Sequence, residues 1–75
     1  MALRMQQSFD RKLGARLRDA RLAKGWTLQA MGKKLGVRYN TVFKTENGLV
    51  RITVERLVLA ARALNLPVTD FLNGL

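Results

Sequence analysis

Two short helix-forming segments that follow one another almost without a gap constrain this sequence more than any other feature. The first covers residues 28–35, where apolar side chains repeat at three- and four-residue spacing after Thr27, a typical N-cap. The second covers residues 38–46 and ends at Asn47-Gly48. Gly36 lies between them and can adopt the positive φ of a sharp turn, so the sequence predicts two helices set at a steep angle. An ordinary helical hairpin would have the same pattern.

Gly32 and Val42 fit a close crossing of these two segments. Gly32 lies four residues before Gly36, at the point where one helix would cross the other and a small residue is needed. Val42 lies six residues after Gly36 and would fill the space beneath the turn. Both residues therefore favour two helices that pack against each other at the turn.

Three more helices are predicted around this pair. The first covers residues 9–24, the next covers residues 54–65, and a final helical turn begins near Thr69. Their expected N-caps are Ser8, Thr53 and Thr69. The sequence therefore predicts an all-α domain of five helices over residues 9–75, preceded by a flexible N-terminal arm over residues 1–8.

The residue composition limits the chemistry of any site. The sequence contains no Cys and no His, which excludes disulfides, thiol chemistry, a histidine base and the usual zinc ligands. Its five Asp and Glu residues show no arrangement of a catalytic acid, base or nucleophile. We therefore expect neither an enzyme nor a protein that needs a cofactor or a metal ion.

Length and hydropathy indicate a single soluble domain. A chain of 75 residues is too short to divide into two cores, and we expect no effector domain within it. Residues 1–9 lack the long apolar stretch of a signal peptide, and no run approaches the ~20 apolar residues of a membrane span. We expect a cytoplasmic, nucleoid-associated protein that binds neither a membrane nor a small-molecule effector.

The net charge favours an anionic partner. Fourteen Lys and Arg residues stand against five acidic residues, so the formal net charge is +9. Such an excess is typical of proteins that bind DNA, RNA or an anionic membrane. A basic soluble domain without a charged partner would have the same composition.

The order of these elements resembles a known family, the lambda-repressor and Cro class, also called Xre-type. The resemblance covers about residues 13–72. The matching positions are Leu13-Gly14, Arg16-Leu17-Arg18, Arg21, Gly25, Thr27, Leu35-Gly36-Val37, Thr41-Val42, Glu46-Asn47-Gly48, Leu57, Ala60 and Ala63-Leu64. The resemblance implies a compact five-helix DNA-binding domain whose second and third helices form a helix-turn-helix, together with sequence-specific operator binding and a two-fold symmetric dimer.

The resemblance also implies which side chains read DNA bases. The expected set is Arg38, Tyr39, Asn40, Phe43 and Lys44, at the start of the third helix and one turn further on. Asn40 can bind adenine, Arg38 or Lys44 can bind guanine, and an apolar ring can pack against a thymine methyl group. A solvated polar face with Phe43 turned into the core is the alternative.

Other positions are expected to bind phosphate or to hold the fold together. Asn47 matches a phosphate-binding position of the family, and Thr27 offers its hydroxyl beside free helix amides. Gln29 follows Leu28, which replaces a phosphate-binding Gln common in the family, and Arg51 is a candidate on electrostatic grounds alone. The resemblance pairs Arg21 with Glu46 in an ion pair that would hold the third helix against the core.

Several positions depart from the family and add apolar surface. Arg38 replaces a small capping residue, and Thr45 replaces an aliphatic core residue, which predicts weaker packing of the third helix. Apolar residues exceed what one small core needs in the loop after residue 48 and near the C-terminus. We expect a homodimer interface formed by Val50, Ile52, Leu59, Leu66, Val68, Phe71, Leu72 and Leu75. Simple filling of the core under a loop is the alternative.

The sequence as a whole predicts a phage or bacterial regulator of transcription. We expect a repressor that reads the major groove with its third helix, bound as a homodimer to a palindromic operator on double-stranded DNA. The alternative is an Xre-type antitoxin or accessory module whose main partner is another protein. A membrane-surface or RNA-binding protein would explain the charge, but it would not explain the order of turn, caps and core residues.

Overall fold

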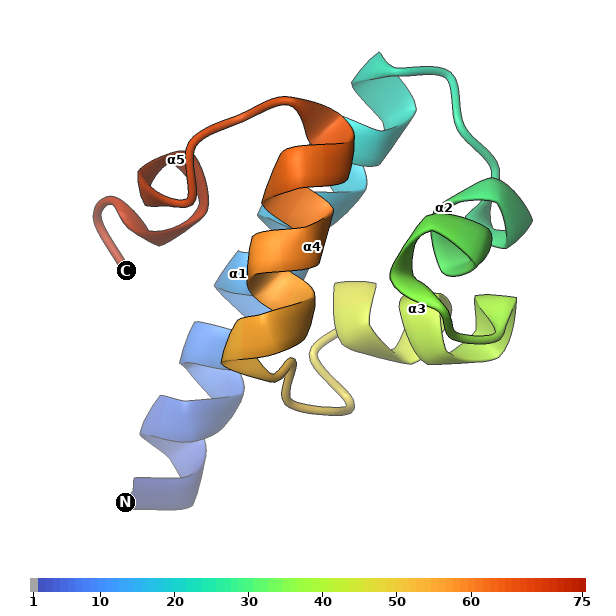
Figure 1. The fold of residues 1–75 in the computed structure, drawn as a ribbon. Helices are drawn as coiled ribbons and strands as arrows, with labels where there is room; N and C mark the ends of the chain where they lie inside the picture. Colours follow the sequence, from blue (N-terminus) through green and yellow to red (C-terminus); the bar gives the residue numbers. More distant parts are fainter. Residues whose placement is uncertain (1) are drawn as a thin grey trace.

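A computed structural model describes the backbone of residues 2–75 and the side chains of residues 8–75. Over this range the chain forms five helices and no strand. They are α1 (Ala2–Ala23), α2 (Leu28–Leu35), α3 (Tyr39–Glu46), α4 (Val54–Leu64) and α5 (Thr69–Leu72). Figure 1 shows α4 lying across α1, with the angled pair α2 and α3 on one side and α5 on the other. The all-α fold class is confirmed.

Local sequence signals account for the helix boundaries in the middle of the chain. The Oγ1 atom of Thr27 accepts a hydrogen bond from the amide of Ala30 at 3.0 Å, and Thr53 caps α4 in the same way. Gly36 ends α2 with φ 70°, as the turn requires. Asn65 ends α4 in the left-handed region, which Asn tolerates better than most residues. The caps predicted at Thr27 and Thr53 are confirmed.

Two helix starts differ from the sequence prediction. α1 begins at Ala2 rather than at residue 9, and it therefore includes residues 2–8, where we expected a flexible arm. This stretch contains no Gly or Pro, so nothing in it interrupts a helix, and Ser8 lies inside α1 instead of capping it. Thr69 is the first residue of α5 and not its N-cap, because Val68 already has helical backbone angles. Arg4, the residue of such an arm that could extend toward DNA, has a side chain that lies outside the described residues.

The core receives side chains from all five helices. It consists of Leu13, Leu17, Met31, Val42, Leu57, Ala60, Ala61, Leu64 and Phe71. Phe71 is only 2% exposed, so the expectation that it lines a dimer interface is wrong. After Pro67 the chain turns back and packs α5 against α1, which buries this ring inside the monomer. Burial of a Phe side chain contributes about 1.5–3 kcal/mol.

The other expected interface residues divide into two groups. Ile52, Val68 and Leu75 are half-buried and pack against the core, so much of their surface is already used within the monomer. The side chains that remain open to solvent are Val50 (37%), Leu59 (36%), Leu66 (37%) and Leu72 (39%). Core filling and an exposed apolar surface therefore coexist in the same segment.

Two glycines allow helices to approach more closely than any other residue would. A Cβ atom on Gly32 would lie 2.6 Å from the carbonyl oxygen of Val37, which confirms that a small residue is needed where α2 meets the turn. A Cβ atom on Gly14 would collide with the carbonyl oxygen of Thr45 and lie 2.6 Å from that of Glu46. Gly14 thus lets α1 lie directly on the C-terminal end of α3, a role that the sequence reasoning missed.

Candidate nucleic-acid interface

The turn between α2 and α3 fixes the position of α3. Gly36 is left-handed, and the amide of Val37 donates to the carbonyl of Gly32 at 2.9 Å, which closes the end of α2. The chain then enters α3 at Arg38, an N-cap whose side chain makes no capping hydrogen bond. The guanidinium of Arg38 is therefore not used in holding the helix.

One side of α3 is buried and the opposite side is open. Val42 is 3% exposed and fills the space beneath the turn, as the sequence predicted. The expected base-reading residues Arg38, Tyr39, Asn40, Phe43 and Lys44 are all exposed. Phe43 is 49% exposed, so the alternative that places its ring in the core is wrong. Asn40, Phe43, Lys44 and Asn47 follow helical i, i+3, i+4, i+7 spacing and form a single stripe, which we call the α3 stripe.

A buried ion pair anchors the C-terminal end of α3. Arg21 Nε lies 2.7 Å from Glu46 Oε2, and Arg21 Nη2 lies 3.0 Å from Glu46 Oε1. The third donor, Nη1, reaches the carbonyl oxygen of Trp26 at 2.7 Å. The side chains are 9% and 4% exposed, so both charges are removed from water but fully hydrogen-bonded. Arg21 is therefore structural, and its guanidinium is not available to bind DNA.

The four expected phosphate-binding residues lie at the two ends of the helix pair. Thr27 and Gln29 are exposed at the start of α2, where the hydroxyl of Thr27 still has a proton to donate. Asn47 is exposed at the end of α3, and one proton of its Nδ2 group is donated to the carbonyl of Phe43 at 2.8 Å. Arg51 is 56% exposed and lies 3.4 Å from Asp10 in an exposed ion pair. All four side chains are thus exposed at the surface.

Thr45 stands where the family usually has an aliphatic core residue, and this difference has a local structural consequence. Its hydroxyl donates to the carbonyl of Thr41 at 2.8 Å, so it is satisfied within α3. A small apolar cavity nevertheless lies beside it, lined by Leu35, Val37 and Ile52 among others. A longer aliphatic side chain at this position would have room to extend into this space, so the weaker packing of α3 stays a prediction.

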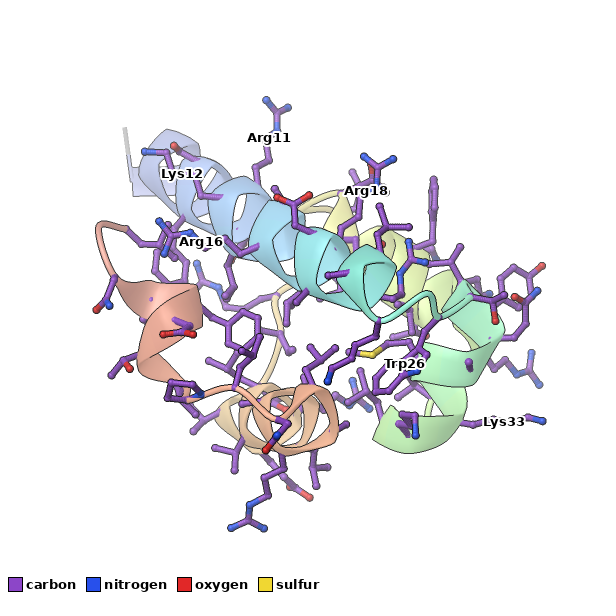
Figure 2. All side chains as sticks on the ribbon, turned by 90° about the horizontal axis from the view of Figure 1, so that it is seen from above. Arg11, Lys12, Arg16, Arg18, Trp26 and Lys33 are labelled. Carbon is purple, nitrogen blue, oxygen red and sulfur yellow. The ribbon has the colours of Figure 1, made fainter. Side chains whose placement is uncertain are left out.

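Sequence reasoning missed two arginines of α1 that lie near the end of α3. Arg11 and Arg18 line a groove together with Asn47, and Figure 2 shows both side chains projecting from the same outer side of α1. Lys12 and Arg16 lie toward α5 instead. The seven-residue spacing of Arg11 and Arg18 could have indicated that they lie together, because residues seven apart share one face of a helix.

In the part of the chain that the structure describes, neither a cluster of metal ligands nor a membrane-spanning helix is found. Among residues 8–75, no three acidic side chains come together in a way that could hold a metal ion. None of the five helices is long and apolar enough to cross a membrane.

A short helix, a glycine turn and a second short helix with an open polar face together define a helix-turn-helix protein. Comparison with known proteins agrees. The model of a family described as helix-turn-helix matches residues 17–71. The chain therefore belongs to the lambda-repressor and Cro class, the Xre-type family of helix-turn-helix transcriptional regulators.

Individual relatives and solved structures support this assignment. An uncharacterized HTH-type transcriptional regulator of Rickettsia conorii is 36% identical over 69 residues, which are 92% of this chain and 55% of the relative. A similarly described protein of Sinorhizobium medicae is 32% identical over 63 residues, which are 84% of this chain and 45% of the relative. The chain thus spans about half the length of these curated relatives.

Two solved structures have the same fold. The clp gene regulator ClgR from Corynebacterium glutamicum superimposes with a TM-score of 0.82 at 31% identity, covering 85% of this chain and 68% of that one. The restriction-modification controller protein C.AhdI from Aeromonas hydrophila gives a TM-score of 0.81 at 25% identity, covering 87% of this chain and 94% of that one. The first is described as a gene regulator and the second as a controller protein.

Proposed function

We propose that this chain is a sequence-specific repressor of transcription that binds double-stranded DNA and inserts α3 into the major groove. The α3 stripe carries the proposal, because its side chains are open to solvent while Val42 and Glu46 hold the opposite side of α3 in the core. The major groove is wide enough to admit an α-helix, and each base pair presents a distinct pattern of donors and acceptors there.

The chemistry of this helix suits base reading. The amide of Asn40 can bond to adenine N6 and N7, and the ring of Phe43 can pack on a thymine methyl group. Arg38 and Lys44 can donate to guanine O6 and N7, since neither side chain is held by a hydrogen bond or ion pair within residues 8–75. Tyr39, 54% exposed, can reach a sugar or a phosphate. In this proposal, Thr27 and Gln29 hold one side of the DNA backbone, and Asn47 and Arg51 hold the other.

Two variants of the α3 stripe test this proposal. Asn40→Ala and Lys44→Ala are expected to relax sequence preference, each at a cost of about 1–3 kcal/mol for the cognate site. Asn47→Ala should instead weaken all sequences alike, because a phosphate contact carries no sequence information. The measurement is the affinity for a duplex that the wild-type chain selects from a random pool, against a scrambled duplex of equal length. If Asn40→Ala and Lys44→Ala leave the preference intact, α3 does not read the bases.

We also propose that two copies bind a palindromic operator. The support is that Val50, Leu59, Leu66 and Leu72 each expose an apolar side chain outside the α3 stripe. A two-fold symmetric pair would place one α3 in each half-site, about one turn of DNA apart.

Analytical sedimentation tests the dimer. At micromolar concentration we expect a species of twice the chain mass of 8.5 kDa, and Leu66→Asp should convert it to the monomer by placing a charge in an apolar interface. Leu22→Asp is the matched control, because Leu22 is 52% exposed on α1, outside the proposed interface. A wild-type chain that sediments as a monomer with and without DNA would contradict the dimer.

The same exposed side chains favour a second candidate function. An Xre-type antitoxin or accessory module would use this surface, together with Leu49 at 68% exposure, to bind a different protein. A stable one-to-one complex with a protein encoded next to it, combined with a monomeric free chain, would favour this candidate over the homodimeric repressor.

A further inference from the structure

A groove between α1 and the C-terminal end of α3 shares only Asn47 with the contacts proposed so far. Its lining comprises Arg11, Ala15, Arg18, Asp19, Glu46 and Asn47. We infer that this groove binds the phosphate backbone of the same DNA, with Arg11 and Arg18 as the contacting side chains. The inference rests on the proposed DNA-binding function and extends the contact surface from α3 onto α1.

Close packing of α1 against the end of α3 creates the groove. Gly14 lets the helix lie on the last carbonyl groups of α3. Gly48, with φ 72°, turns the chain so that a Cβ atom there would lie 2.9 Å from the Cα atom of Arg11. The backbone of α1 therefore touches the loop that follows α3, and Arg11 is held beside Asn47 by the fold itself.

Arg11 and Arg18 are spaced to act together. They are seven residues apart, so they lie on the same face of α1 with Ala15 between them, about 10 Å apart along the helix axis. Both are exposed, and Figure 2 shows their guanidinium groups pointing outward on the same side. Because Ala15 is small, an extended anion can approach the helix between the two charges.

The charges of the groove are not neutralised by the protein. Two ion pairs form among residues 8–75, Arg21–Glu46 and Arg51–Asp10, and neither includes Arg11 or Arg18. Glu46 lines the groove, but its carboxylate is already bound by Arg21. Asp19 is the remaining acid, so two positive charges face one negative charge, and the groove attracts anions.

The groove continues the α3 stripe. Asn40, Phe43, Lys44 and Asn47 occupy one side of α3, and Asn47 is also part of the groove lining. A duplex bound along the stripe therefore reaches the groove at the end of α3. A phosphate backbone is the partner that matches this position, because the groove is polar, positively charged and adjacent to the proposed base-reading face.

A purely structural role is the competing explanation. Cations near the C-terminal end of a helix interact favourably with its carbonyl groups, so Arg11 and Arg18 would then stabilise α3 without touching DNA. The two explanations differ in the salt dependence of binding. A side chain that neutralises a phosphate releases counterions, whereas a side chain that stabilises a helix does not.

The test compares two double variants that each remove two positive charges. Arg11→Ala/Arg18→Ala removes the groove arginines, and Lys12→Ala/Arg62→Ala removes exposed charges beside α5 and on α4. The probe is a duplex of about 30 base pairs selected by the wild-type chain, titrated between 50 and 200 mM salt. Arg11→Gln/Arg18→Gln serves as a second groove variant, since it keeps most of each aliphatic stem. Thermal melting of every variant shows whether it is folded.

We expect the groove variants to reduce the slope of log K against log salt by about 1.8 for each bound chain. Over the fourfold rise in salt, the wild-type chain would then lose about 12-fold more affinity than the groove variants. The control variant should lower affinity slightly and leave the slope unchanged. Asp19→Asn should raise affinity, and Asp70→Asn on α5 should not.

The measurements distinguish a failure of the groove inference from a failure of the proposed DNA-binding function. If the wild-type chain binds the duplex but the groove and control variants have the same slope, the inference is overturned and the proposed function stands. Lower melting temperatures of the groove variants with an unchanged slope would assign the two arginines to helix stabilisation, which also overturns it. If the wild-type chain binds no duplex at any salt concentration, both the inference and the proposed function are wrong.

Discussion

Replacing Glu46 by Ala is expected to lower the free energy of unfolding by about 3–5 kcal/mol, because the substitution strands a buried charge. Arg21 is 9% exposed and directs three donors at Glu46 and at the carbonyl of Trp26. Without the carboxylate, two of these donors lose their partner in a place that water reaches poorly. For a chain of this size the Tm should fall by roughly 15 °C or more. Urea denaturation followed by circular dichroism measures the change.

The exposed ion pair of this chain is the matched control. Arg51 is 56% exposed and lies 3.4 Å from Asp10. Arg51→Ala should therefore cost less than about 1 kcal/mol, since solvent screens an exposed pair. Removing both buried charges in Arg21→Met/Glu46→Leu should recover much of the stability lost in Glu46→Ala. A loss below 1 kcal/mol in Glu46→Ala would mean that the pair does not anchor α3.

Replacing Phe71 by Ala is expected to cost about 3–5 kcal/mol of unfolding free energy, because it opens a cavity in the core. The ring is 2% exposed and is among the largest fully buried side chains of the molecule. It also joins α5 to the rest of the core, so its loss should release the C-terminal segment. Denaturation at a concentration where sedimentation finds only monomer separates this effect from any change in association.

Leu72→Ala is the control for Phe71→Ala. Leu72 is the next residue in α5, and it is 39% exposed. Its truncation should change the stability of the monomer by about 0.5 kcal/mol or less. If Phe71→Ala instead left monomer stability unchanged and weakened only self-association, Phe71 would belong to an interface and not to the core.

The sequence predicted the helix-turn-helix well because its signals are local. Thr27 caps α2 through an amide three residues away, and Gly36 supplies the left-handed residue that ends it. Spacing alone predicted that Val42 faces inward. Such signals depend on neighbouring residues, so they can be read without knowing how distant parts of the chain meet.

The sequence was less informative where distant segments meet. The sequence pattern around an aromatic residue such as Phe71 is compatible both with an interface and with a core. Only the packing of α5 against α1 places its ring in the core. The start of α1 was misjudged for a different reason. Ser8 is a good N-cap, but strong helix formers before it allow the helix to begin at Ala2.

For the turn and the α3 stripe, local sequence determined which residues form the helices and which sides face solvent. The tertiary structure decided what surrounds them. Gly14 and Gly48 bring α1 against the end of α3, which places Arg11 and Arg18 beside Asn47 although more than 25 residues separate them in the chain. The close approach depends on the absence of a side chain at each glycine. It depends equally on the backbone atoms that lie opposite each glycine, and only the folded chain brings those atoms there.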